Sequence, residues 1–255
     1  MRNSFFNQPA AVVTALLNPA ADMEDNLAMI RRAAEQGAQG IALQMMQVPP
    51  ERRSEDDFRR MMDAAPELPF MVIDYRGDKW LGGDDEARQQ CLFAAARAGA
   101  EVVDVMGDLY DPAANELTMK PTAIERQKAL IRQFHDLGAK VVMSSHTHQA
   151  FTAEAILAHL REQAARGADI LKIVTRADTE EELLEGFRAT MLLKRALAQP
   201  FIQLCGGKYS RPHRYLAPKF GLAVAFAILD ETPSSVQPSI PHLRTVLDTI
   251  QWPTA

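Results

Sequence analysis

The sequence predicts an α/β protein folded as a (β/α)8 barrel, the TIM-barrel architecture. Short apolar runs alternate with amphipathic runs from one end of the chain to the other. Eight strand–helix units in 255 residues match the usual size of such a barrel. Neither a linker nor a low-complexity segment interrupts the alternation, so we expect a single barrel domain over residues 1–255.

The strand candidates are short, β-branched and apolar, which is typical of strands buried on both faces. In order, they cover residues 11–17, 40–46, 70–75, 101–106, 140–145, 170–174, 201–205 and 221–228. Helical periodicity lies between and after them, and the glycines at 37 and 40 mark the end of the first helix. The helix candidates cover residues 21–36, 55–64, 84–98, 122–137, 152–166, 179–198 and 242–250. Residues 206–219 show little helical pattern.

A doubly wound open sheet is the alternative architecture. It usually has fewer strands, and no Gly-x-Gly-x-x-Gly motif follows the first strand candidate to indicate a dinucleotide site. Barrel enzymes carry their chemistry at the C-terminal ends of the strands. The ends of the predicted strands therefore supply the candidate functional residues.

Composition narrows the class of partner. The formal net charge of −5 argues against a nucleic acid or an anionic membrane surface. The two cysteines, Cys91 and Cys205, form no metal-binding pattern and no disulfide framework, which favours a reducing compartment. The chain shows neither a signal-peptide pattern nor an apolar run of ~20 residues. We expect a cytoplasmic protein that acts on a small molecule, and the sequence leaves open whether it forms a homodimer.

Lys172 is the most informative residue, because it lies in an otherwise apolar strand over residues 168–174. An ammonium group is costly to bury there, whereas a neutral amine costs less and is a nucleophile toward carbonyl groups. This placement favours Schiff-base chemistry. The alternative is a lysine that simply pairs with a buried carboxylate.

Two histidines follow the neighbouring fifth strand candidate. His146 or His148 would lie beside Lys172, because adjacent strands are ~5 Å apart. A near-neutral pKa suits either imidazole to move protons on and off a carbinolamine. The alternatives are a loop histidine bonded to backbone and a zinc ligand, but no third zinc ligand is evident.

Several further strand ends carry groups that suit a substrate anion. Residues 206–214 combine two glycines with Lys208, Arg211 and Arg214, which indicates a pocket for a carboxylate or a phosphate, or else a solvated basic loop. Arg76 follows the third strand and could contact substrate oxygens or pair with Asp104 or Asp108. Residues 230–241, rich in serine and proline, could form a lid or a plain connector.

These residues resemble the type I 3-dehydroquinate dehydratases over most of the chain, most strongly over residues 141–250. Residues 141–146 are similar to the strand with the family's catalytic histidine, and residues 167–173 to the segment with its Schiff-base lysine. The resemblance implies that Lys172 attacks the ketone of 3-dehydroquinate, and that His146 removes the neighbouring proton and helps expel a hydroxyl as water. It implies no metal and no organic cofactor.

The resemblance also implies a set of substrate-binding residues. Arg214 corresponds to the carboxylate-binding arginine, Gln237 to the lid glutamine, and Arg76 to the arginine that ends the third strand. Ser235 lies beside the position of the lid serine, and Gln44 replaces a family glutamate.

Other polar positions of the family are absent. Met46 stands where the family has an arginine, and Met106 replaces a glutamate on the fourth strand. Leu81 replaces the glutamate that orients the family's histidine, so we expect a histidine without its carboxylate partner. Because these groups would bind hydroxyls, their absence predicts a substrate with fewer or different hydroxyl groups.

Three functions are therefore open. The first is a Schiff-base lyase that acts on 3-dehydroquinate or a related cyclic keto acid. The second is a class I aldolase whose substrate phosphate is held by Lys208, Arg211 and Arg214. The third is a ligand-binding homologue that keeps the pocket without the chemistry.

Overall fold

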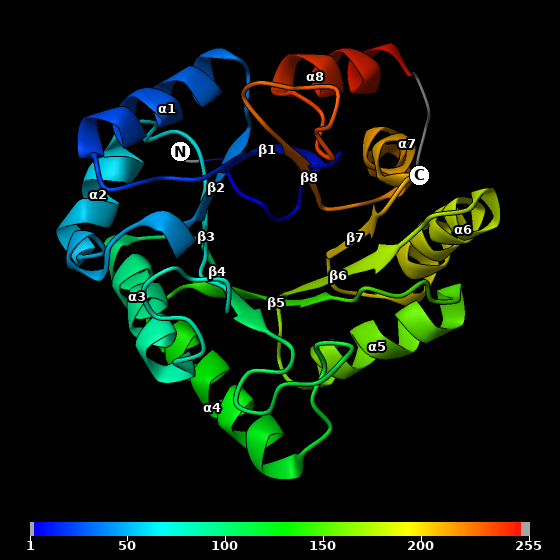
Figure 1. Ribbon diagram of the computed structural model, residues 1–255, viewed down its shortest axis with the longest axis horizontal. Coiled ribbons are helices and arrows are strands. Elements are labelled where there is room, and N and C mark those ends of the chain that lie inside the picture. The colour runs from blue at the N-terminus through cyan, green and yellow to red at the C-terminus, as the bar shows by residue number, and fades with distance from the viewer. Residues whose placement is uncertain (1–2, 251–255) are drawn as a thin grey trace.

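The computed structural model describes residues 3–250, and it shows a ring of parallel strands surrounded by helices (Figure 1). The strands are β1 Val12–Leu17, β2 Gly40–Gln44, β3 Phe70–Ile73, β4 Val102–Met106, β5 Lys140–His146, β6 Ile170–Arg176, β7 Phe201–Gly206 and β8 Val224–Ala227. The helices are α1 Met23–Glu35, α2 Glu55–Asp63, α3 Asp85–Ala98, α4 Pro121–Asp136, α5 Ala153–Ala165, α6 Glu180–Ala196, α7 Ser210–Leu216 and α8 Ile240–Thr249. The 3₁₀ helices are η1 Met45–Gln47, η2 Pro50–Arg52 and η3 Ala217–Phe220.

The strands form one sheet that nearly closes on itself. Their order is β7-β6-β5-β4-β3-β2-β1-β8, all in parallel register. The two outer strands of this order meet where the Ala223 N–H, just before β8, donates to the Phe201 carbonyl of β7 at 2.9 Å. The predicted (β/α)8 barrel is therefore confirmed.

The strands are apolar on both faces because the helices cover their outer side and side chains fill the barrel. All five residues of β4 are buried, as are all four of β3 and of β8. Capping boxes fix the starts of α2, at Ser54 with Asp57, and of α6, at Thr179 with Glu182. These local signals position each helix against the strand that precedes it.

The structure departs from the sequence pattern in two places near the C-terminal ends of the strands. The second strand ends at Gln44, and Met46 lies in η1 instead of continuing it. The segment between β7 and β8 contains α7, whose buried residues are the polar Ser210, His213 and Arg214. Because polar side chains face inward, α7 has no apolar periodicity that would reveal it.

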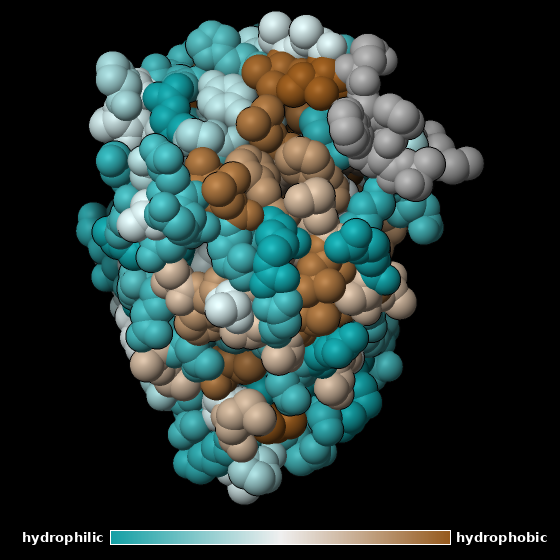
Figure 2. Space-filling view, turned by 90° about the vertical axis from the view of Figure 1, so that its right-hand side faces the viewer, coloured by the Kyte–Doolittle hydropathy of each residue, from teal (hydrophilic) through white to brown (hydrophobic). Residues whose placement is uncertain are grey.

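The molecular surface is mixed in polarity. Figure 2 shows apolar residues separated by polar ones on the face that lies to the right in Figure 1, where α6 is located. Leu184 and Met191 of α6 are among the exposed large apolar side chains. Within residues 3–250, every helix falls short of the length and apolarity that crossing a bilayer requires.

Candidate active site

Lys172 projects from β6 into the barrel, where its side chain is only 5% exposed and lines a cavity. Its Nζ lies 3.6 Å from Oδ2 of Asp104, which is close enough for electrostatic attraction but too long for a strong hydrogen bond. Burial lowers the pKa of the Lys172 amine, and the nearby Asp104 carboxylate only partly opposes this effect. The amine is therefore easier to deprotonate than an ordinary lysine.

The backbone around Lys172 is fixed by a buried amide on the outside of the barrel. Gln163 of α5 accepts a hydrogen bond from the Lys172 N–H at 3.0 Å and donates one to the Lys172 carbonyl at 2.9 Å. A side chain that bonds both backbone groups of one residue holds that residue in a single orientation. Gln163 was not indicated by the sequence, because a glutamine in an amphipathic helix normally faces solvent.

His146, at the end of β5, lies next to the amine. Its Nε2 is 3.2 Å from Lys172 Nζ. Its ring packs edge-to-face against that of Tyr75, with 4.8 Å between the ring centroids. The imidazole is 36% exposed, so the ring remains reachable from the cavity. Burial and the neighbouring Lys172 lower the pKa of His146, while Glu116 acts in the opposite direction. The neutral imidazole is consequently favoured near pH 7.

Glu116 is the carboxylate partner of His146, so the expectation that this histidine lacks one is wrong. Its Oε2 accepts a 2.7 Å hydrogen bond from the His146 backbone N–H and lies 3.5 Å from Nδ1. Burial would raise the pKa of Glu116, but its contacts with His146 outweigh this and lower it. A carboxylate facing Nδ1 stabilises the tautomer that is protonated there, which leaves Nε2 as a base toward the cavity.

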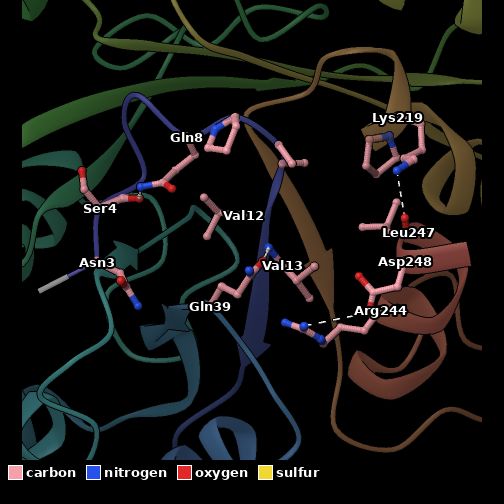
Figure 3. A pocket seen from close by; sticks show the side chains of 14 residues that line it. Asn3, Ser4, Gln8, Val12, Val13, Gln39, Lys219, Arg244, Leu247 and Asp248 are labelled. Carbon is pink, nitrogen blue, oxygen red and sulfur yellow. Dashed lines mark hydrogen bonds and ion pairs between the residues drawn. The ribbon is translucent and has the colours of Figure 1, made fainter. Parts of the chain in front are cut away.

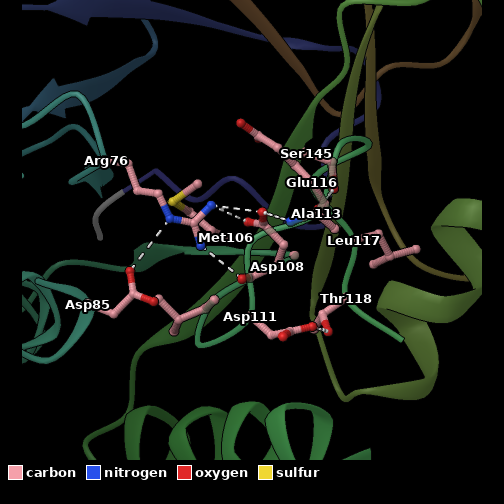
Figure 4. A network of polar contacts seen from close by, with 12 residues as sticks. Arg76, Asp85, Met106, Asp108, Asp111, Ala113, Glu116, Leu117, Thr118 and Ser145 are labelled. Carbon is pink, nitrogen blue, oxygen red and sulfur yellow. Dashed lines mark hydrogen bonds and ion pairs between the residues drawn. The ribbon is translucent and has the colours of Figure 1, made fainter. Parts of the chain in front are cut away.

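The loop between β4 and α4 is shaped to deliver Glu116 (Figure 4). Glu116 has a left-handed backbone with φ 49°, and its carbonyl accepts a 2.6 Å hydrogen bond from Ser145 Oγ. A Cβ added to Gly107 would lie 2.5 Å from that carbonyl oxygen and 2.7 Å from Ser145 Oγ. Only glycine at 107 lets the loop pass this close to β5.

Arg76, which follows β3, binds this loop and is not among the lining residues of the cavity, in contrast to its predicted role in substrate binding. One guanidinium nitrogen lies 2.8 Å from each carboxylate oxygen of Asp108, and the other donates to the Asp108 carbonyl at 2.8 Å. Asp108 in turn accepts a hydrogen bond from the Ala113 N–H at 2.8 Å. Arg76 thus stabilises the loop that carries Glu116, in line with the alternative pairing that the sequence left open (Figure 4).

A second chain of hydrogen bonds supports Asp104. The Tyr75 hydroxyl and Ser144 Oγ are 2.5 Å apart, and Ser144 donates to Asp104 Oδ1. Because the single hydroxyl proton of Ser144 is used on Asp104, Tyr75 must be the donor to Ser144. Burial raises the pKa of Tyr75 well above its usual value, so its hydroxyl stays protonated.

The cavity in front of Lys172 has a volume of about 330 Å³. Its apolar lining residues are Leu16, Met46, Ile73, Val174, Leu204 and Phe226. Its polar lining residues are Gln44, Tyr75, His146, Lys172, Arg214 and Gln237. The C-terminal ends of the strands and the loops after them thus converge on one site, as barrel architecture dictates.

Arg214 of α7 lines this cavity and has one unused donor. Its Nε donates to the Cys205 carbonyl at 3.1 Å, but its buried Nη1 has no hydrogen-bond partner in the described residues. Burial lowers the pKa of Arg214 to about 10, so the guanidinium is still charged at neutral pH. The buried Oε1 of Gln237 also lacks a partner there. The Arg214 nitrogen is suited to bind a ligand carboxylate, and the Gln237 oxygen is suited to accept a hydrogen bond from a ligand.

Other candidates from the sequence lie elsewhere. Ser235 is not a lining residue, because its Oγ accepts a hydrogen bond from the Thr232 N–H at 2.9 Å within the β8–α8 loop. His148 is exposed in the loop after β5 and does not reach the cavity. Lys208 is exposed, and Arg211 pairs with Glu231. The three-cation phosphate site expected for an aldolase is therefore not assembled.

A larger cavity of about 630 Å³ lies at the opposite end of the barrel, beside the start of β1 (Figure 3). Its cations are engaged with backbone carbonyls: Lys219 donates to Leu247 at 2.8 Å and Arg244 to Gly37 at 3.1 Å. It contains no nucleophile beside a base among its lining residues. Size alone thus does not identify the reactive site, and the smaller cavity around Lys172 is the candidate.

Comparisons of the sequence with known proteins agree on one family. A family model described as type I 3-dehydroquinase matches residues 19–252. The 3-dehydroquinate dehydratase of Klebsiella pneumoniae is 30% identical over 174 residues, which cover 66% of this chain and 64% of that protein. The enzyme of the same name from Aromatoleum aromaticum is 30% identical over 196 residues, 76% of this chain and 71% of that protein.

Solved structures show the same fold. The 3-dehydroquinate dehydratase from Geobacillus kaustophilus superposes with a TM-score of 0.81 at 21% identity, covering 96% of this chain and 92% of that one. The alignment to the Klebsiella protein spans slightly less than two thirds of its length, but the family model spans most of this chain. The chain belongs to the type I 3-dehydroquinase family.

Proposed function

We propose that the protein is an imine-forming carbon–oxygen lyase that dehydrates a cyclic β-hydroxy keto acid of the 3-dehydroquinate type. One observation carries this proposal: Lys172 Nζ lies 3.2 Å from His146 Nε2 in a cavity that is also lined by Arg214, whose Nη1 has no partner in the described residues. A nucleophile, a base and an anion site thus surround one volume. A binding protein has no need for a buried amine beside an imidazole that remains reachable from the cavity.

Each step follows from these groups. The neutral Lys172 amine attacks the ketone, and loss of water gives a protonated imine. The iminium withdraws electrons and makes the neighbouring C–H bond acidic. His146 Nε2 takes that proton, and the same imidazolium then gives it to the departing hydroxyl, which leaves as water. Hydrolysis of the conjugated imine releases the enone acid and restores the amine. The iminium is the electron sink, so the sequence of steps requires no cofactor.

The surrounding residues support these steps. Arg214 would bind the substrate carboxylate, and Gln237 would accept a hydrogen bond from the substrate. Asp104 lies 3.6 Å from the amine and would stabilise the cationic imine. Glu116 would orient His146. Gln44 lines the cavity, and its Nε2 already donates to Asn18 Oδ1 at 3.0 Å.

Reductive trapping tests the proposal. The protein is incubated with 3-dehydroquinate and sodium borohydride, and its intact mass is measured while enone formation is followed by absorbance. We expect a stable adduct and turnover for the wild type, and neither for Lys172→Met. Lys208→Met is the matched control, because Lys208 is an exposed lysine outside the cavity. The absence of an adduct from every cyclic keto acid at saturating concentration would instead favour a ligand-binding role.

We further propose a cytoplasmic location. Cys91 and Cys205 are both buried free thiols, which agrees with a reducing compartment. Cell fractionation with an antibody to the native protein tests this, and recovery in an extracytoplasmic fraction would contradict it.

A further inference from the structure

The cavity wall across the barrel from Lys172 is apolar. In the strand order, β1 and β2 are four positions away from β5 and β6, which places them on opposite sides of the closed barrel. Leu16 of β1 and Met46 of η1 line the cavity from this far side, and Phe226 of β8, two strands from β6 in the closed barrel, continues their surface. Ile73 at the end of β3 extends the same surface. A substrate bound to Lys172 must turn part of its ring toward this wall.

The polar groups near this wall are few and are partly engaged. The amide nitrogen of Gln44 donates to Asn18, and the Tyr75 hydroxyl donates to Ser144. Arg76, the cation that follows β3, is held by Asp108 outside the cavity. Among the lining residues of the described chain, no charged side chain comes from β1, β2, β3 or β8. The wall therefore offers hydroxyl groups only the carbonyl and the second N–H of one side-chain amide and the Tyr75 oxygen as an acceptor, and no charged group.

The opposite side of the cavity carries the reactive polar groups, beside the apolar side chains of Val174 and Leu204. It is lined by Lys172, His146 and Arg214, and the lid adds Gln237; Arg214 Nη1 and Gln237 Oε1 have no hydrogen-bond partner within the described residues. These groups match one ketone, one leaving hydroxyl and one carboxylate. The ketone, the leaving hydroxyl and the carboxylate of a β-hydroxy keto acid thus all find partners on one side of the cavity, and the far wall is not required to bind them.

We propose that the preferred substrate is a cyclic β-hydroxy keto acid whose ring carbons facing Leu16, Met46 and Phe226 carry no hydroxyl groups. This inference rests on the proposed function and names the substrate class for the same site. A hydroxyl pressed against this wall would lose its water without gaining a partner, whereas a methylene group there gains by burial. 3-Dehydroquinate has hydroxyls on C4 and C5, and we infer that it is not the best substrate.

A pair of substrates tests the inference. 1-Hydroxy-3-oxocyclohexane-1-carboxylate keeps the ketone, the leaving hydroxyl and the carboxylate of 3-dehydroquinate but lacks the hydroxyls on C4 and C5. Its dehydration gives 3-oxocyclohex-1-ene-1-carboxylate and one water. We expect kcat/KM for this compound to exceed that for 3-dehydroquinate by roughly tenfold or more, the usual effect of one unpaired buried hydroxyl. Equal values, or a preference for 3-dehydroquinate, would overturn the inference.

Variants of the wall provide a second readout. Met46→Arg adds donors to the far wall, and we expect it to shift the ratio of the two kcat/KM values toward 3-dehydroquinate by about tenfold. Met46→Leu is the matched control and should keep the wild-type preference. A ratio that Met46→Arg leaves unchanged, in a folded protein, would show that the wall does not select the substrate.

The outcomes separate this inference from the function on which it rests. Borohydride adducts with both compounds, together with faster turnover of 3-dehydroquinate, would support the proposed lyase activity but contradict the proposed substrate preference. The absence of an adduct with either compound would contradict the proposed lyase activity itself. The wild-type comparison decides the question even if Met46→Arg fails to fold.

Discussion

Replacing Glu116 with glutamine removes one charge from the active site and changes little else. The glutamine Oε1 can still accept the 2.7 Å hydrogen bond from the His146 N–H, so the loop keeps its anchor. The carboxylate that lies 3.5 Å from His146 Nδ1 is lost. The imidazole then has a weaker preference for a proton on Nδ1 and becomes a weaker base at Nε2. We expect kcat to fall while substrate binding is retained.

The size of the effect follows from the geometry. An opposite unit charge about 4 Å away at an effective dielectric constant of about 20 contributes roughly 4 kcal/mol. Glu116 is 22% exposed, so water screens part of this interaction. A nearby opposite charge typically shifts a pKa by one to three units. We expect the pKa of His146 to fall, because Glu116 no longer opposes the effect of burial, and kcat to fall by about 10- to 100-fold, as for other groups that orient a functional histidine.

The assay is the pH dependence of kcat/KM, measured for Glu116→Gln and for Glu125→Gln as a control. Glu125 is an exposed residue of α4 that pairs with Lys128. The base must be neutral to accept a proton, so activity rises with pH through the pKa of His146. A lower pKa therefore moves the acidic limb to lower pH in Glu116→Gln and leaves it in place in Glu125→Gln. An unchanged limb with unchanged kcat would refute the positioning role.

Arg214→Ala should raise KM by about 10- to 100-fold, because a buried charged hydrogen bond to the substrate carboxylate is lost. Arg76→Ala should instead lower kcat and the melting temperature with little change in KM, since Arg76 stabilises the loop; equal effects on KM would contradict this division. Gly107→Ala should destabilise the protein by about 1–3 kcal/mol in urea unfolding, because its Cβ would lie 2.5 Å from the Glu116 carbonyl oxygen. A variant as stable as the wild type would show that the loop adjusts freely.

The barrel could be predicted from the sequence because its signals are local. Each strand is a short apolar run, and each preceding helix ends at a recognisable boundary such as Gly37 or Gly99. α7 could not be predicted, because its buried residues His213 and Arg214 are polar and its face toward the barrel has no apolar pattern. A helix that serves a binding site need not look amphipathic.

The geometry around Lys172 and His146 was also accessible from the sequence, because the register of adjacent strands sets it. Ser144 pairs with Lys172 and His146 pairs with Val174, so both functional side chains face inward at the same end. Glu116 was inaccessible, since its position depends on a left-handed backbone and on contacts with a distant strand. No periodicity distinguishes such a loop carboxylate from a solvated one.

Arg76 shows why residue identity at a strand end is not sufficient to assign a role. Its position at the end of β3 is compatible with substrate binding, yet Asp108 and Asp85 hold the guanidinium on the outer side of the site. Those acidic partners come from the next loop and the next helix. The sequence could name the possible pairing but could not decide between it and a substrate contact.

The central claim is that the Lys172 amine forms the covalent intermediate. The most direct measurement is peptide mapping of the borohydride-trapped protein by tandem mass spectrometry, with each substrate in turn. We predict one modified lysine, Lys172, and no adduct on the exposed Lys208. A modification on any other lysine, with Lys172 unmodified, would contradict the account.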